Sequence, residues 1–412
     1  YLQHLSLTNF RNYVRLELDF PTRLTLLQGA NAQGKTNLLE AIAYLATSRS
    51  LLAGADRELV NWLAQDDPLA FMRVRGEVEQ KSNRQRLEIV LAPSNRVPQE
   101  NGLLRYHKQV RINGIKKRAL DIIGRLRVVF FLPQDIELVA GPPSVRRRYL
   151  DISLCQMDPV YCHHLSAYNR VLAQRNALLR ALRERGGAPE QLLFWDERLV
   201  EHGSYIIARR QNVLAALELH AYDHHRDLSD GRERLRLRYI PSVDPEHVPS
   251  ADYQLRLNLS IAEQRAPYGL ADPAQIVEVY KAQLLHAHRQ EIAAGMSLLG
   301  PHRDDFAFIV KGRDLRTYGS RGQQRTAALA IKLAEVQVMT EETGDTPLLL
   351  LDDVMSELDR TRRAMLLQLL NRVSQAIITT TEWDPFPLEF RRKARNLTVI
   401  EGQIREAELT MT

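Results

Sequence analysis

The sequence contains no apolar run long enough to span a bilayer, and no hydrophobic stretch typical of a secretory signal opens it. We therefore expect a cytoplasmic protein without a membrane partner. A strong charge imbalance is also missing, because 56 lysines and arginines against 50 aspartates and glutamates give a net charge of only +6. This excess permits an acidic partner such as nucleic acid but does not require one. The 412 residues are enough for two or three domains.

Cysteine is almost absent from the chain. Cys155 and Cys162 are the only two, and their spacing would place them on one helical face, close to His163 and His164. A metal site built from these four side chains is conceivable. Cysteines in such a helix are more often buried free thiols, so we favour that interpretation.

One segment carries a specific chemical signal. Residues 29–36 read Gly-Ala-Asn-Ala-Gln-Gly-Lys-Thr and match the phosphate-loop pattern G-x-x-x-x-G-K-[ST]. A short apolar run precedes the segment and apolar residues at helical spacing follow it, which favours a phosphate loop over a plain glycine turn. Lys35 would reach the β- and γ-phosphates, and the Thr36 hydroxyl would ligate Mg²⁺. The predicted ATP and Mg²⁺ site comprises Gly29, Ala30, Asn31, Ala32, Gln33, Gly34, Lys35, Thr36 and Asn37.

Three further strand ends could serve this site. Four leucines at 348–351 lead directly into Asp352 and Asp353. In phosphate-loop proteins the first such aspartate holds Mg²⁺, and the neighbouring carboxylate can polarise the attacking water. An apolar strand that ends at Pro133 is followed by Gln134, which could touch Mg²⁺ or position water. The strand at 376–378 ends in threonines that could line the γ-phosphate.

Other segments offer contacts to anions. Residues 320–323 read Ser-Arg-Gly-Gln and precede a helical pattern, so they would form a second anion cradle at a helix N-terminus. Arg11 and Asn12 lie in the turn of a predicted strand hairpin, where they would either face a phosphate or form a plain turn. The basic stretch from Arg105 to Arg118 contains an Asn-Gly hairpin signal. It is either a DNA-facing strand pair or a solvated edge.

The middle of the chain is mainly helical. Helical spacing over 158–185 and 190–222, on either side of a Gly-Gly turn, predicts a short antiparallel helix pair without sustained heptads. Three arginines at 146–148 would fan around a helix, so that one or two of them could reach phosphate. The loop at 299–305 is by default a local salt-bridged turn, with contact to nucleotide or DNA as the alternative. Further predicted strands are 71–78, 87–91, 235–240, 253–261 and 306–310, and a further helix is 276–294.

The motifs occur in the order found in ABC-type ATPase heads: the phosphate loop, Gln134, Ser320-x-Gly322-Gln323, Asp352-Asp353 and Ser356-x-x-Asp359. Four longer blocks resemble the RecF family of bacterial DNA replication and repair proteins, and they are spread from end to end of the chain. These blocks are Leu7-Thr8-Asn9-Phe10-Arg11-Asn12-Tyr13, Arg146-Arg147-Arg148-Tyr149-Leu150-Asp151, Gly300-Pro301-His302-Arg303-Asp304-Asp305 and Ser320-Arg321-Gly322-Gln323-Gln324-Arg325.

The resemblance implies an α/β fold, an ABC-type P-loop ATPase head with a mixed sheet and helices, split between both chain ends. A mainly helical arm is inserted between them. We place the head at residues 1–138 and 291–412 and the arm at 139–290. A transporter's nucleotide-binding subunit, an SMC-like structural DNA clamp and a small-molecule kinase are the alternatives. The size of the arm disfavours the transporter subunit, and its lack of heptads disfavours the SMC-like clamp. The Ser-Arg-Gly-Gln segment disfavours the kinase.

The resemblance also assigns roles to residues. Lys35 and Thr36 grip phosphate and Mg²⁺, while Gln134 and Asp352 attend the metal. Asp353 stands where most ABC enzymes carry glutamate, and its shorter side chain would hold water less well and slow the turnover of ATP. Ser320 and Gly322 would contact the γ-phosphate bound to another subunit. The expected nucleotide site is completed by Arg11, Asn12, Gln323 and Asp359. The expected catalytic residues are Asp353, Gln134 and Lys35.

In function, the resemblance implies a weak, DNA-stimulated ATPase that forms a homodimer when it binds ATP. It implies binding to duplex DNA and to junctions of duplex and single strand. It further implies that the protein works with RecO and RecR to load RecA, in DNA replication, DNA repair and the SOS response.

Overall fold

The chain folds into two compact units. The computed structural model describes residues 1–64, 71–80, 83–94, 106–243 and 273–407. Residues 1–134 and 339–412 form the first unit, and residues 135–338 form the second. Both chain ends thus build one unit, but the limits differ from those expected at 138 and 291. Residues 291–338 make their contacts with the helical unit, because strand β10 in this segment pairs with β9.

The first unit contains a six-stranded antiparallel sheet. Its strand order is β2-β1-β4-β5-β6-β7. Buried and exposed residues alternate along β4 and most of β5, as expected for strands with one face on the core. The predicted hairpins are confirmed, and Asn113 and Gly114 form the β6–β7 turn with positive φ angles. The strands are β1 (Leu2–Phe10), β2 (Tyr13–Asp19), β4 (Met72–Gln80), β5 (Asn83–Pro93), β6 (Tyr106–Ile112) and β7 (Ile115–Lys117).

A second, mainly parallel sheet joins the two ends of the chain. Its strand order is β15-β14-β3-β13-β12-β8, and only β15 runs antiparallel to its neighbour. The strands β12 and β13 are buried along their whole length, which matches their uninterrupted apolar sequences. The strands are β3 (Leu24–Gln28), β8 (Val128–Phe131), β12 (Leu348–Asp352), β13 (Ala376–Thr380), β14 (Arg395–Ile400) and β15 (Gln403–Glu406).

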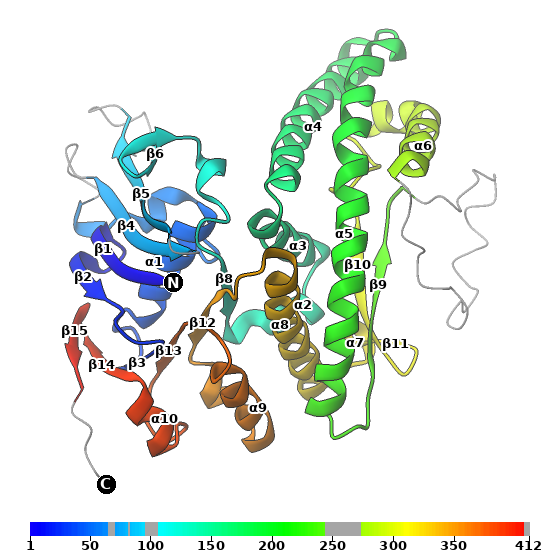
Figure 1. Cartoon of the computed structure of the whole chain (residues 1–412). Helices are drawn as coiled ribbons and strands as arrows, with labels where there is room; N and C mark the ends of the chain where they lie inside the picture. The colour runs from blue at the N-terminus through cyan, green and yellow to red at the C-terminus, as the bar shows by residue number, and fades with distance from the viewer. Residues whose placement is uncertain (65–70, 81–82, 95–105, 244–272, 408–412) are drawn as a thin grey trace. The chain divides into compact units, whose positions relative to one another are not determined.

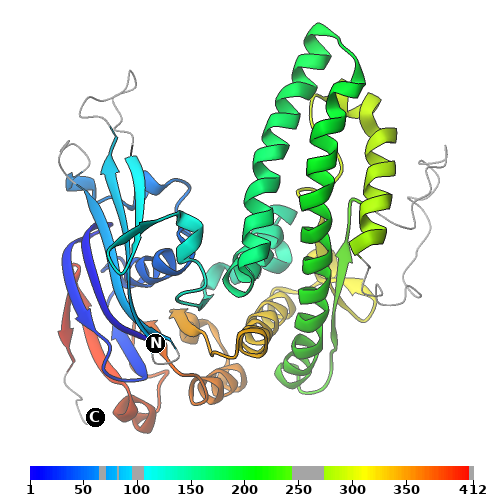
Figure 2. The same ribbon diagram turned by 45° about the horizontal axis from the view of Figure 1, so that its top comes forward.

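Helix α1 (Lys35–Thr47) lies between the two sheets of the first unit (Figures 1 and 2). It contacts β1, β4 and β5 on one side and β8, β12 and β13 on the other. Nearly every residue of α1 is buried, so the helix is apolar around its circumference rather than along one stripe. The helix therefore fixes the distance between the sheets and begins directly at the predicted phosphate loop. Two further helices, α9 (Arg360–Leu370) and α10 (Leu388–Lys393), complete the unit.

The second unit is mainly helical, as predicted. In Figure 1, α4 and α5 run antiparallel on either side of the Gly186-Gly187 turn. Asp158 ends α3 and caps α4, since its carboxylate accepts from the N–H groups of Val160 and Tyr161. The predicted strand 253–261 lies outside the described residues. The elements are α2 (Glu137–Ala140), α3 (Pro143–Met157), α4 (Pro159–Arg185), α5 (Leu193–Leu228), β9 (Leu235–Ile240), α6 (Pro273–Ala294), β10 (Asp305–Val310), β11 (Arg313–Asp314), α7 (Leu315–Tyr318) and α8 (Arg321–Thr343).

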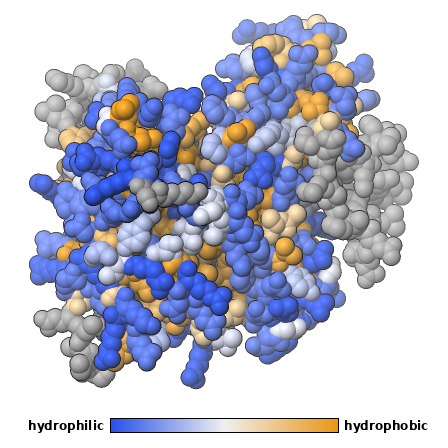
Figure 3. All heavy atoms as spheres, viewed as in Figure 1, coloured by the Kyte–Doolittle hydropathy of each residue, from blue (hydrophilic) through white to orange (hydrophobic). Residues whose placement is uncertain are grey.

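The protein surface is mostly hydrophilic on the face that Figure 3 shows. Among the described residues, no helix is both long enough and apolar enough to cross a membrane. The apolar side chains gather inside the units. One large cluster combines residues of α1 with residues of both sheets that flank it.

Candidate nucleotide-binding site

The predicted phosphate loop connects β3 to α1. Strand β3 lies between β13 and β14, so the loop emerges at the carboxyl edge of the parallel strands, where such sheets bind ligands. Gly34 is the N-cap of α1 with φ 109°, a conformation that side chains rarely adopt. The Lys35 ammonium donates to the carbonyl oxygens of Gly29 at 2.6 Å and Ala30 at 2.9 Å. The Lys35 ammonium group is thus held inside the phosphate loop, where bound phosphates would contact it.

Asp352 connects the loop to the neighbouring strands. The Thr36 hydroxyl donates to Asp352 Oδ2 at 2.7 Å, and the Thr379 hydroxyl donates to Asp352 Oδ1 at 2.8 Å. Three strands therefore bring the hydroxyls and the carboxylate together at one edge of the sheet. Gln134 is exposed three residues beyond β8, the strand that pairs with β12 on its other side. Hydroxyl, carboxylate and amide oxygens are hard donors of the kind that Mg²⁺ prefers.

Asp353 has an unusual backbone and an incompletely satisfied side chain. Its φ of 49° places a non-glycine residue in the left-handed region. Its N–H donates to the Thr379 hydroxyl at 3.0 Å, and its carbonyl accepts from the Ser356 hydroxyl at 2.7 Å. Its Oδ1 is buried without a hydrogen-bond partner, and burial raises the pKa of the carboxyl. Burial also lowers the pKa of Lys35, although Asp353 and Asp352 oppose that shift. Such a carboxylate can accept a hydrogen bond from water.

The turn between β1 and β2 contacts the loop and helix α1. Asn12 Nδ2 donates to the Gln33 carbonyl at 3.1 Å, and the Tyr13 hydroxyl donates to the Gly34 carbonyl at 2.9 Å. Arg11 instead forms a two-point ion pair with Glu40 of α1, at 2.8 and 3.0 Å, so its contact is with protein. The sequence offered no signal for the roles of Tyr13 and Glu40, because each contact depends on the fold.

Asp359 is the N-cap of α9, where its Oδ1 accepts from the N–H of Arg362 at 2.9 Å. Its Oδ2 also pairs with the Arg362 guanidinium at 2.8 Å. In this structure the residue therefore orders the start of a helix beside the site, and a contact with nucleotide stays a prediction.

The Ser320–Gln323 segment begins helix α8 in the second unit. The Gln323 side chain accepts from the Ser320 N–H at 2.9 Å, and the Ser320 hydroxyl accepts from the Gln323 N–H at 3.3 Å. These reciprocal bonds form a capping box. Gly322 has open space around its α-carbon, with only the Ser320 hydroxyl within 4 Å of an added Cβ. The segment thus has the helix N-terminus and the small exposed residue that an anion cradle needs.

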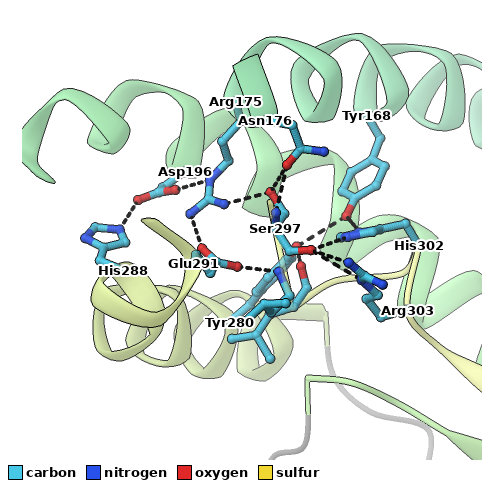
Figure 4. A network of polar contacts seen from close by, with 12 residues as sticks. Tyr168, Arg175, Asn176, Asp196, Tyr280, His288, Glu291, Ser297, His302 and Arg303 are labelled. Carbon is cyan, nitrogen blue, oxygen red and sulfur yellow. Dashed lines mark hydrogen bonds and ion pairs between the residues drawn. The ribbon is translucent and has the colours of Figure 1, made fainter. Parts of the chain in front are cut away.

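The Gly300–Asp305 loop belongs to a buried network in the second unit (Figure 4). His302 Nε2 lies 3.2 Å from the Ser297 carbonyl, and its Nδ1 lies 2.6 Å from the Tyr168 hydroxyl. Because a carbonyl only accepts, Nε2 carries the proton and Nδ1 accepts from Tyr168. The loop is therefore bonded mainly to distant segments of the second unit, such as Tyr168 and Arg146, and is not the local salt-bridged turn of the default interpretation. A contact with nucleotide or DNA stays a prediction.

Arg175 is the centre of the same network. It has no exposed surface, and its guanidinium contacts Asp196 at 2.7 Å, Glu291 at 2.6 Å and the Ser297 hydroxyl at 2.8 Å. These partners come from α5, α6 and the segment that follows α6, so Arg175 of α4 connects three helices. His288 adds a second contact to Asp196, at 2.6 Å.

The three successive arginines of α3 have different surroundings. Arg146 is buried and pairs with Asp305 at 2.6 Å, while Arg147 donates to the Asp304 carbonyl at 2.7 Å. Arg148 is exposed. The three arginines therefore point in different directions around the helix, as expected from helical geometry. Arg146 and Arg147 make their contacts within the second unit.

The two cysteines, Cys155 and Cys162, are buried and form no disulfide. Within the described ranges, no group of three or more His, Cys, Asp or Glu side chains could hold a metal ion. Part of the basic stretch is paired, since Arg111 contacts Glu88 at 3.5 Å and Arg118 contacts Asp121 at 2.9 Å. Arg105 lies outside the described residues.

The sequence resembles known proteins over nearly its whole length. Residues 1–391 match the RecF/RecN/SMC N-terminal domain family. The DNA replication and repair protein RecF of Chloroflexus aggregans is 42% identical over 414 residues, which cover 98% of this chain and 99% of that protein. The RecF of Chloroflexus aurantiacus is 41% identical over 413 residues, with the same coverage.

The fold gives the same result. A solved structure of the recombination mediator protein RecF with ATP, in the RecFOR pathway, superposes with a TM-score of 0.82 at 33% identity. It covers 99% of this chain and 98% of that chain. An Smc head domain from Pyrococcus furiosus superposes with a TM-score of 0.50 at 14% identity, covering 100% of this chain and 96% of that chain, which is a likeness of fold alone.

Proposed function

The chain belongs to the RecF family of DNA replication and repair proteins, and from this premise we propose that it is an ATP-dependent DNA-binding protein of recombinational repair. The observation that carries the proposal is the pair of bonds from Thr36 and Thr379 to Asp352 beside the phosphate loop. This arrangement supports binding and hydrolysis of ATP, the nucleotide named for the RecF structure that the chain resembles.

In the proposed reaction, Lys35 exchanges the carbonyls of Gly29 and Ala30 for the phosphates of ATP. Thr36, Asp352 and Gln134 would hold Mg²⁺, which neutralises charge on the phosphates when bound. The buried Asp353 Oδ1 accepts a hydrogen bond from the attacking water and orients it. The products are ADP and phosphate.

We propose that two chains share the nucleotides. Each chain has one phosphate loop and one Ser320–Gln323 cradle, and a two-fold dimer would place the cradle of one chain against the loop of the other. ATP then forms part of the interface, and hydrolysis releases it. The dimer would bind duplex DNA and junctions of duplex and single strand, mainly through phosphate contacts, and DNA would stimulate a weak ATPase.

The partners follow from the family. The solved relative is a recombination mediator of the RecFOR pathway, so we propose RecO and RecR as partners and loading of RecA as the outcome. Participation in DNA replication and the SOS response is part of the same proposal.

The decisive experiment measures molecular mass in solution by light scattering, with ATP, with ADP and without nucleotide. We expect a dimer only with ATP, and monomers for Lys35→Met and Ser320→Arg under every condition. Binding of a fluorescent ATP analogue separates the variants, because Ser320→Arg should keep nucleotide affinity while Lys35→Met loses it. A wild-type chain that binds ATP but stays monomeric at high concentration with DNA present would contradict the shared-nucleotide arrangement.

A further inference from the structure

Gln33 of the phosphate loop is held by two turns that are far away in the sequence. Its backbone carbonyl accepts from the Gly402 N–H at 3.1 Å and from Asn12 Nδ2 at 3.1 Å. Its side-chain Oε1 accepts from the Glu401 N–H at 2.6 Å. Glu401 and Gly402 form the turn between β14 and β15, with φ angles of 48° and 75°.

The direction of these bonds has a consequence for the next amide. In a trans peptide, the carbonyl of one residue and the N–H of the following residue point in opposite directions. Since the Gln33 carbonyl points toward Asn12 and Gly402, the Gly34 N–H points away from both turns. Amides of a phosphate loop bind anions only when they point toward a common centre.

The contact between the loop and the turns leaves little free space. A Cβ on Gly34 would lie 2.4 Å from Asn12 Nδ2. A Cβ on Gly402 would lie 3.1 Å from the Asn12 carbonyl oxygen and 3.2 Å from Asn12 Nδ2. Asn12 is further fixed by Asn37, whose Nδ2 donates to Asn12 Oδ1 at 2.8 Å.

We propose that Asn12 and the Glu401–Gly402 turn position the phosphate loop for nucleotide. They hold the Gln33 carbonyl outward, so that the Gly34 N–H stays directed at the phosphates. Asn12 and Gln33 then act through the backbone of the loop rather than by touching ATP themselves. This inference deepens the proposed function and rests on it.

Coupling of this kind is reciprocal. If the turn favours the binding-competent loop, bound ATP must stabilise the turn by the same free energy. Nucleotide occupancy is therefore linked to the order of a hairpin close to the end of the described chain.

A glycine substitution tests the proposal with a matched control. Gly402→Ala adds a methyl group against Asn12 at a left-handed φ, whereas Gly114→Ala adds one at φ 81° with nothing within 4 Å. Both glycines follow a residue with positive φ in a hairpin turn, so the two substitutions carry similar backbone strain. We expect both variants to lose thermal stability without nucleotide, and Gly402→Ala to lose more because its methyl group also crowds Asn12. Only Gly402→Ala should weaken binding of a fluorescent ATP analogue, by at least about fivefold.

Equal ATP affinity in the two variants would overturn the positioning role while leaving ATP binding intact. A wild-type chain that binds no ATP would overturn the proposed function, and this inference with it. If Gly402→Ala does not fold, Gln33→Ala replaces it, with Gln368→Ala, an exposed glutamine of α9 outside the proposed site, as its control. A direct readout is amide hydrogen exchange of the wild type, in which ATP should slow exchange at Glu401 and Gly402 but not at Gly114. Unchanged exchange at the β14–β15 turn would contradict the coupling.

Discussion

The Thr36 hydroxyl donates a hydrogen bond to Asp352 Oδ2 at 2.7 Å across 316 positions of sequence. The two residues belong to opposite ends of the chain, and they meet because β3 and β12 both flank β13 in the parallel sheet. The candidate metal ligands are therefore assembled by the protein fold itself.

We expect Asp352→Asn to lower ATP turnover by at least about 100-fold, because the substitution removes the charge that would hold Mg²⁺. Thr379→Val is the graded control, since it removes a hydroxyl that orients Asp352 and accepts from the Asp353 N–H but is not a proposed metal ligand, and it should cost about 10-fold. Phosphate release at saturating ATP measures both effects. Full activity of Asp352→Asn would exclude the proposed metal role.

We expect Asp353→Glu to raise ATP turnover several-fold. The longer side chain would place its carboxylate closer to the attacking water, while Asp353→Asn should abolish turnover and preserve ATP binding. The measurement is single-turnover hydrolysis together with binding of an ATP analogue. If the glutamate variant turns over at the wild-type rate or more slowly, a short side chain is not the cause of slow turnover.

Arg175→Met should destabilise the second unit by about 3–5 kcal/mol, because it leaves Asp196 and Glu291 buried without their cation. Arg198→Met on the same helix hairpin is the control. Its ion pair with Glu201 is about half exposed, so its loss should cost less than about 1 kcal/mol. Chemical denaturation measures both variants, and equal costs would refute the importance of the buried network.

His302 should make the protein sensitive to acid. Burial lowers the pKa of His302 from the ordinary histidine value of about 6.5 to about 4. Between about pH 6.5 and pH 4, His302 is protonated in the unfolded chain but neutral in the native chain. The free energy of unfolding therefore falls as the pH drops from 6.5 toward 4, by up to about 3 kcal/mol. His302→Gln keeps one acceptor and one donor without titrating, and it should flatten this part of the stability curve.

DNA affinity should depend steeply on salt and on ATP. Phosphate contacts release counterions, so the logarithm of the binding constant should fall linearly with the logarithm of the salt concentration. Fluorescence anisotropy with duplexes of two unrelated sequences measures the slope. Affinity that is flat with salt, or equal with ATP and ADP, would contradict an ATP-assembled clamp.

The sequence was a good guide to the fold where local pattern decides the structure. The run of leucines before Asp352, the Asn113-Gly114 turn and the Gly186-Gly187 break each predicted an element that the structure contains. In each case a few neighbouring residues determine the structure. The leucines bury a parallel strand, Asn113-Gly114 adopts the positive φ angles of a hairpin, and Gly186-Gly187 ends a helix.

Contacts between distant segments were not predictable in this way. Nothing in the local pattern around Glu401-Gly402 indicates that its N–H groups bind Gln33. On composition the Arg11-Asn12 turn could equally face a phosphate or be a plain turn, and the ion pair between Arg11 and Glu40 forms only because α1 lies beside the β1–β2 turn. The boundaries between the two units differ from the expected ones because of another contact between distant segments. Strand β10 pairs with β9, from which it is separated by a long connection.

The position of β3 between β14 and β13 determines when the site can form during biosynthesis. A ribosome delivers the phosphate loop first and the two flanking strands last. Until translation has passed β14, one backbone edge of β3 has no partner strand, and the loop lacks the Gly402 N–H. The nascent chain therefore cannot complete this site until the β14–β15 turn has been made, long after the phosphate loop itself.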